Sequence, residues 1–128
     1  MSGETDLGRL LATLRVERLA DPVTVVTLQE PVPLGEGVLA LLTEAEGTTA
    51  VVTIDAAERR GWSVGFRGAW LTLAVHSSLE AVGLTAAVST ALAEKGIACN
   101  VLAGFHHDHA LVPLDRADDA VDAIEELA

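Results

Sequence analysis

Several residue types are scarce in this 128-residue sequence, and each shortage excludes a class of protein. The single cysteine, Cys99, cannot form an intramolecular disulfide, which favours a reducing compartment. Lys95 is the only lysine, and the formal net charge of -11 opposes binding to nucleic acid or to anionic membranes. The start, MSGETDLGRL, lacks the basic and apolar regions of a signal peptide. We therefore expect a cytoplasmic protein that binds neither nucleic acid nor membrane.

Aromatic residues make up only 3% of the chain, whereas half of its residues are hydrophobic. The core must therefore be aliphatic and rich in alanine. A chain of this length can bury roughly two-thirds of its unfolded surface without disulfides. It corresponds to one compact domain.

The clearest helix is predicted over residues 79–95. Ser77 with Glu80 has the spacing of a capping box, which would fix the start of this helix. Lys95 places positive charge at the end of the helix, and Gly96 can adopt the left-handed conformation that ends it.

Strands flank this helix. Residues 69–76 alternate between two faces, with Leu71, Leu73 and Val75 on one of them. Residues 97–104 and 109–113 read as two further strands that form a hairpin. A last helix follows over 115–127, so the order from residue 69 onward is β-α-β-β-α. This is a ferredoxin-like unit without its last strand, which the first half of the chain or a second subunit would supply.

The first half of the chain is less clearly marked. Thr5 or Asp6 can cap a short helix that extends to Leu14, and a strand is expected over 23–28. Residues 38–54 contain two apolar runs, which form either a hairpin or a helix followed by a strand. Asp55 and Glu58 have the spacing of a second capping box, for a helix that ends at Gly61.

The segment VHSSLEAVGLTAAVSTALAEKGIACNVLAG resembles the ACT domain: a strand, a loop with a glycine near the helix start, a small-residue helix ending LAEKGI, and a polar residue in the next strand. Gly83 and Asn100 occupy the glycine and polar positions. GFHHDHALVP stands where arginine-sensing ACT proteins of the CASTOR type have a characteristic strand, with Asp108 at its aspartate. The whole chain looks like a small free-standing ACT protein with two ACT-like halves, residues 1–67 and 68–128.

This resemblance implies an α+β, ferredoxin-like fold with an antiparallel sheet and helices on one face. It implies a non-catalytic regulatory or sensor protein that binds a small molecule, typically an amino acid. A homo-oligomer is expected because the second face of the sheet carries Trp70, Thr72 and Ala74 and needs to be covered. No cofactor is implied. The expected ligand site lies at the helix start and the hairpin rim, and comprises His76, Ser77, Ser78, Val82, Gly83, Leu84, Asn100, Phe105, His107 and Asp108.

Two other interpretations stay open. His76, His107 and His109 could share one face of the sheet and hold a metal ion, although polar residues at a hairpin rim explain them more simply. A purely structural module that dimerises through its sheet is the other. A hydrolase built on Ser77 or Ser78 with His76 is disfavoured, because neighbouring strand side chains point to opposite faces and capping explains the serines.

Overall fold

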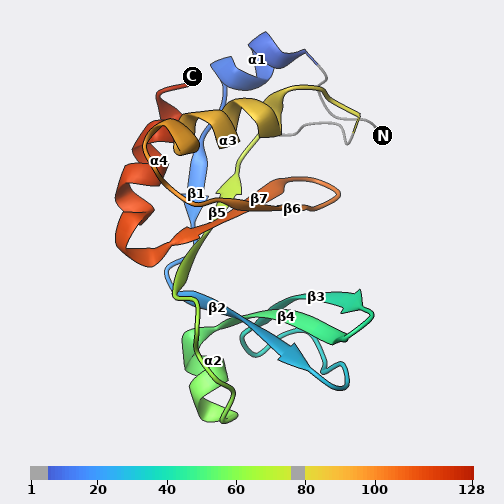
Figure 1. The fold of residues 1–128 in the computed structure, drawn as a ribbon. Coiled ribbons are helices and arrows are strands. Elements are labelled where there is room, and N and C mark those ends of the chain that lie inside the picture. The colour runs from blue at the N-terminus through green and yellow to red at the C-terminus, as the bar shows by residue number, and fades with distance from the viewer. Residues whose placement is uncertain (1–5, 76–79) are drawn as a thin grey trace. The chain divides into compact units, whose positions relative to one another are not determined.

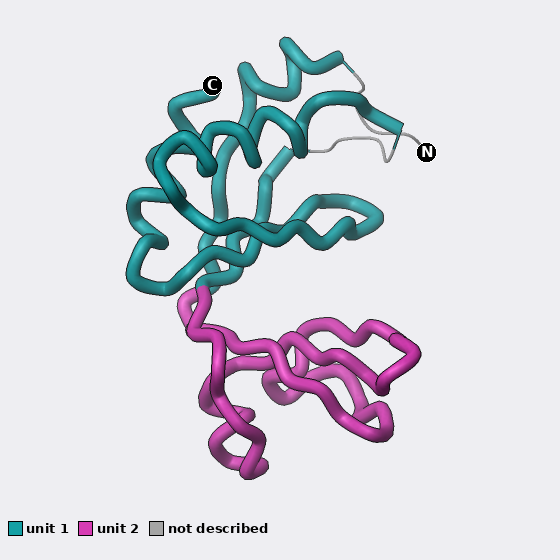
Figure 2. Tube along the Cα trace, viewed as in Figure 1, with its two compact units in different colours: residues 1–19, 69–128 teal, residues 20–68 magenta. Residues whose placement is uncertain are grey.

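The structure is a computed structural model that describes residues 6–75 and 80–128. The chain divides into two compact units. Unit 1 comprises residues 1–19 and 69–128, and unit 2 comprises residues 20–68 (Figure 2). No helix within the described residues is long and apolar enough to cross a membrane.

Unit 1 contains a four-stranded sheet in the order β1-β5-β7-β6. Its strands are β1 (Val16–Arg18), β5 (Gly68–Leu73), β6 (Asn100–Ala103) and β7 (Asp108–Pro113). The predicted hairpin is confirmed, since β6 and β7 are antiparallel. β1 pairs antiparallel with β5, in the position of the last ferredoxin-like strand. The first half of the chain therefore supplies the missing edge strand.

Three helices cover one face of this sheet: α1 (Leu7–Ala12), α3 (Leu84–Glu94) and α4 (Ala117–Glu125), with the short 3-10 turn η1 (Leu114–Arg116) before α4 (Figure 1). Leu71 and Leu73 of β5 are buried beneath them, as their alternation predicts, together with Val88 and Leu92 of α3 and Ile124 of α4. Burial of each such side chain contributes about 1.5 to 3 kcal/mol. The other sheet face carries Trp70 and Thr72, which are only partly buried.

Unit 2 is a smaller version of the same arrangement. Its strands are β2 (Val23–Leu28), β3 (Val38–Glu44) and β4 (Gly47–Thr53), in the order β3-β4-β2, followed by α2 (Ile54–Arg59). The two apolar runs over 38–54 therefore form a hairpin. A loop over residues 29–37 stands where unit 1 has α3. On its other side β2 pairs with β5 at one position, Val23 with Gly68.

Two helix starts differ from their predictions. α3 begins at Leu84 instead of residue 79, because Gly83 has a left-handed backbone with φ +105° that a helix cannot contain. The capping serine, Ser77, lies outside the described residues. α2 is capped by the Thr53 hydroxyl, which accepts a hydrogen bond from the Ala56 N–H, instead of by Asp55. The predicted Asp6 cap and the Gly96 helix end are confirmed.

Candidate functional site

The turn between β6 and β7 is held against the end of β5. The His107 Nδ1 lies 3.3 Å from the Val75 carbonyl oxygen, and the Gly104 N–H donates to the His107 carbonyl at 3.0 Å. This contact places the hairpin rim beside Val75, which follows β5. The rim and the start of α3 lie at the same end of unit 1 (Figure 1).

The start of α3 has no side-chain cap from its own N-cap residue. Gly83 at the N-cap position makes no side-chain hydrogen bond to the first turn, and that turn contains no acidic residue. The first N–H groups of a helix have no partner inside the helix, and the helix dipole makes this end electropositive. The start of α3 is therefore suited to a carboxylate.

Asp108, the first residue of β7, provides the opposite charge. Burial raises the pKa of its carboxyl, and the neighbouring His109 partly offsets this rise. Within the described residues the carboxylate forms no hydrogen bond or ion pair. A partly buried carboxylate without a partner is unfavourable, so this position is suited to a cationic group brought by a ligand.

His109 lies on the sheet face that the helices leave open. Its Nδ1 is 2.9 Å from the Thr72 hydroxyl, and its ring centroid is 4.8 Å from that of Trp70. Burial lowers the pKa of His109, and the charge of His107 lowers it further, while Asp108 raises it. The neutral imidazole is therefore favoured beside Trp70.

The other predicted site residues are placed unequally. Val82 and Phe105 are exposed, with 83% and 66% of their surface accessible, whereas Leu84 is buried in the core. Asn100 is exposed at the end of β6 opposite Leu111, while Asp108 is opposite Ala103. Three residues along a strand span about 10 Å, and the two side chains point to opposite faces, so Asn100 and Asp108 do not meet within one unit. His76, Ser77 and Ser78 lie outside the described residues.

No three histidine, cysteine or acidic side chains gather as a metal site within residues 6–75 and 80–128. His107 and His109 approach different partners, the Val75 carbonyl and the Thr72 hydroxyl. His76, the third member of the metal hypothesis, lies outside the described residues. Burial raises the pKa of the Cys99 thiol, so little of it is in the nucleophilic thiolate form.

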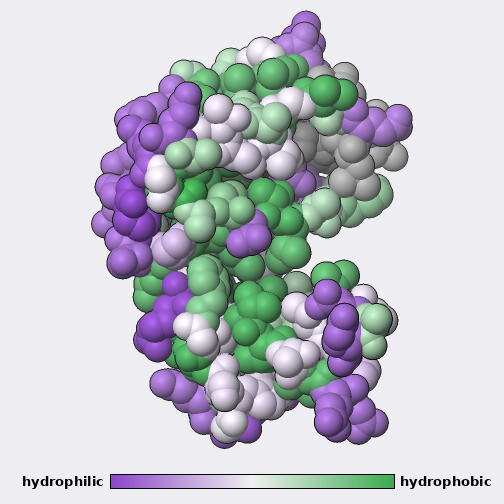
Figure 3. Space-filling model, viewed as in Figure 1, coloured by the Kyte–Doolittle hydropathy of each residue, from purple (hydrophilic) through white to green (hydrophobic). Residues whose placement is uncertain are grey.

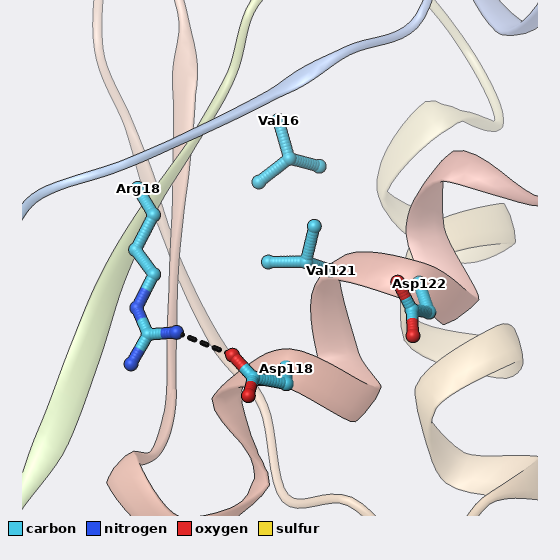
Figure 4. Close-up of a pocket in the computed structure, with 5 residues that line it drawn as sticks. All are labelled: Val16, Arg18, Asp118, Val121 and Asp122. Carbon is cyan, nitrogen blue, oxygen red and sulfur yellow. Dashed lines mark hydrogen bonds and ion pairs between the residues drawn. The ribbon is translucent and has the colours of Figure 1, made fainter.

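Two cavities involve residues that sequence reasoning did not single out. One, of about 290 Å³, lies in unit 1 between β1 and α4 (Figure 4). Arg18 of β1 reaches Asp118 of α4 at 2.7 Å, and the side chains of Val16 and Val121 face each other beside this ion pair. Hydrophilic residues gather along the α4 side of unit 1 (Figure 3). The three-residue strand β1 is too short to show an alternating pattern.

The second cavity, of about 500 Å³, lies within unit 2 beside β2. Its lining residues come from β2 and from the segment that follows α2: Val25, Val26, Thr27, Gly61, Trp62, Ser63 and Gly65. The signal available in the sequence was Trp62, one of only four aromatic residues in the chain.

Comparisons with solved structures support the fold along nearly the whole chain. A Vibrio cholerae protein of unknown function, described as a possible transport protein, is 38% identical, with 93% of each chain covered and a TM-score of 0.83. An Agrobacterium tumefaciens protein is 20% identical, with 89% of this chain and 88% of that chain covered and a TM-score of 0.70. The ligand-free regulatory subunit of aspartate kinase from Thermus thermophilus is 15% identical, with 91% and 97% covered and a TM-score of 0.61. No curated protein matches the sequence.

Two family models match successive parts of the chain. One ACT domain model matches residues 2–67, and a second matches residues 66–126. Unit 1 has the four strands of the ferredoxin-like ACT fold, with β1 from the first match completing its sheet, and unit 2 has three of them. Because the two models span nearly all of the sequence and a relative is 38% identical over 93% of it, this chain belongs to the ACT domain family.

Proposed function

We propose that this protein is a non-catalytic, cytoplasmic sensor that binds a free amino acid at the start of α3 and the rim of the β6–β7 hairpin. ACT domains are typically regulatory domains that bind small molecules, amino acids among them. The proposed site keeps the expected residues around Gly83, His107 and Asp108. Asn100 would contact a ligand held by a neighbouring copy.

The observation that carries this proposal is the Asp108 carboxylate, which is partly buried and has no hydrogen bond or ion pair within the described residues. The start of α3, whose N-cap residue is a glycine, supplies an electropositive position at the same end of unit 1. An amino acid carries a carboxylate and an ammonium, which are the two charges that these positions favour. A ligand with only one charge would satisfy one of them.

A purely structural role explains these features less well. A module that only dimerises gains nothing from a partly buried acid, whose burial is unfavourable without a cation. Oligomerisation is compatible with ligand binding, and we propose a homodimer in which the second copy completes the site. Sedimentation velocity with and without ligand measures the association.

A thermal-shift screen of the common amino acids, followed by calorimetry, tests the proposal. Binding to the folded state alone raises the melting temperature with ligand concentration. Asp108→Asn should weaken binding of a hit by about 10- to 100-fold, because a charge-assisted hydrogen bond contributes about 1.5 to 3 kcal/mol. The decarboxylated amine of the same hit should also bind more weakly, because it cannot occupy the start of α3.

Glu46→Gln is the matched control, since it removes one negative charge from an exposed turn of unit 2. This variant should bind like the unmodified protein. The assignment is wrong if a folded Asp108→Asn protein keeps full affinity for every hit. Divalent metals should then be screened against the histidine rim.

A further inference from the structure

The cavity in unit 2 occupies a vacant strand position. In unit 1, β1 pairs with β5 over three residues and so fills the edge of the sheet beside β5. In unit 2 the corresponding pairing of β2 with β5 stops after Val23 and Gly68. The chain over residues 61–65 then borders the space beside Val25 and Thr27 instead of pairing with them.

Main-chain groups of β2 point into this space. The Ile54 N–H donates to the Pro22 carbonyl at 2.9 Å, which sets the alternation of the β2–β4 ladder. Thr24, Val26 and Leu28 therefore exchange hydrogen bonds with β4, while Val25 and Thr27 direct their N–H and C=O groups to the opposite edge. Within the described residues no hydrogen bond joins that edge of Val25 and Thr27 to another segment.

The remaining walls combine apolar side chains with the polar side chains of Thr27 and Ser63, and positive charge lies nearby. Val26 belongs to the core of unit 2, and Trp62 packs against that core. The Arg60 guanidinium lies 5.0 Å from the centroid of the Trp62 ring. Unit 2 has three basic residues, all between positions 59 and 67, and Arg59 is paired with Asp55. No carboxylate lines the cavity.

We propose that this cavity is a second ligand site, for a small α-amino or α-hydroxy acid with an aliphatic side chain. The carboxylate accepts hydrogen bonds from the outward N–H groups of β2 and is attracted by Arg60. The α-ammonium or α-hydroxyl donates to an outward carbonyl, so that the ligand extends the sheet as one strand residue would. The side chain packs against Val26 and Trp62. A volume of about 500 Å³ is ample for such a molecule.

Tryptophan fluorescence tests this site directly, because the chain has two tryptophans and no tyrosine. In a Trp70→Phe background only Trp62 emits. Valine and 2-hydroxyisovalerate are titrated, with isovalerate lacking the α-donor and valinamide lacking the carboxylate. We expect a saturable change in Trp62 fluorescence with valine, with 2-hydroxyisovalerate, or with both. Isovalerate and valinamide should bind at least 10-fold more weakly.

Gly65→Leu should block the cavity without disturbing the fold. A Cβ at Gly65 meets no atom within 4 Å, and the residue does not have a positive φ. Thr90→Leu adds the same side chain to the exposed side of α3 and serves as the control. Gly65→Leu should reduce affinity at least 10-fold and Thr90→Leu should not. Arg60→Gln should weaken the binding of ligands that carry a carboxylate more than the binding of valinamide.

The proposal is overturned if neither acid gives a saturable signal, if the two truncated analogues bind as well as the acids, or if Gly65→Leu binds normally. The site in unit 1 is tested separately by Asp108→Asn. Binding lost in Gly65→Leu and kept in Asp108→Asn supports the cavity in unit 2 alone. The reverse pattern supports the unit 1 site alone and overturns the second site.

Discussion

The pKa values of two neighbouring side chains of β7 are shifted by the same cause. Burial raises the pKa of the Asp108 carboxyl and lowers that of the His109 imidazole, since desolvation disfavours the charged form of each. The attraction between carboxylate and imidazolium opposes both shifts. Desolvation is nevertheless the largest cause in each case, so both neutral forms are favoured relative to solvent.

The lowered pKa of His109 predicts a pH dependence of stability. As the pH falls below about 6.5, the ordinary histidine value, the unfolded chain takes up a proton that the folded chain resists, so the free energy of unfolding decreases. The raised pKa of Asp108 acts in the opposite direction, since its contribution is lost as the pH rises above the ordinary aspartate value. Urea unfolding of His109→Gln should therefore show a smaller gain in stability between pH 5.5 and 7.5.

His106→Gln removes an exposed histidine from the same turn and controls for the change in composition. The gain in stability with rising pH should be smaller in His109→Gln than in this variant. Equal pH dependence in His109→Gln and in the unmodified protein would show that His109 titrates alike in the folded and unfolded chains.

Gly83 illustrates how one residue sets the bounds of an element. Its φ of +105° ends the preceding loop, and a Cβ at this position would lie 2.9 Å from the Leu7 Cδ2. We expect Gly83→Ala to lower the free energy of unfolding by about 1 to 3 kcal/mol, because an L side chain is strained in this conformation and Leu7 must move. Urea denaturation measures this loss.

Gly65→Ala is the comparison, because its Cβ would meet no atom within 4 Å at an ordinary φ. Its stability should change little or increase by up to about 1 kcal/mol, through reduced freedom of the unfolded chain. An equally small change in Gly83→Ala would indicate that the loop around Gly83 relaxes and that its backbone is not a constraint.

The elements that could be predicted were those with a repeated pattern. Alternation in β5 and the β-branched run of β2 predicted both strands, and Gly96 marked the end of α3. The start of α3 was wrong because a capping-box spacing at Ser77 does not reveal the backbone of Gly83. β1 was not predicted, because a strand of three residues is too short to show an alternating pattern. It forms a strand because it pairs with β5.

The candidate sites were less predictable than the elements. The resemblance to ACT domains located Gly83 and Asp108, whose neighbourhood has suitable charges. It also grouped Asn100 with Asp108, which the hairpin register keeps apart. The cavity beside β2 arises where pairing with β5 stops, a tertiary property that no local pattern encodes.

At the scale of the whole molecule, sequence halves and spatial units do not coincide. The first ACT match extends to residue 67, yet residues 1–19 belong to unit 1 with residues 69–128. β1 therefore connects the halves covalently while it completes the sheet of unit 1. Val16 of this strand also donates its N–H to the Glu125 carboxylate of α4 at 3.1 Å, so this main-chain donor of β1 has a hydrogen-bond partner. α1 adds Leu10 to the core that α3 and α4 form.

This arrangement predicts how unit 1 depends on the N-terminal segment. A fragment of residues 69–128 should aggregate or remain unfolded, because it exposes the β5 edge and the core surface that Leu10 and Leu14 cover. A circular permutant that joins residues 6–19 to the C-terminus through a flexible linker should fold cooperatively, since it restores both. Circular dichroism and urea unfolding compare the two chains.

A permutant carrying Leu10→Ala should lose about 2 to 5 kcal/mol of its free energy of unfolding, because Leu10 is fully buried. Cooperative unfolding of the 69–128 fragment alone would show that β1 and α1 are dispensable, and that unit 1 is independent of the first half.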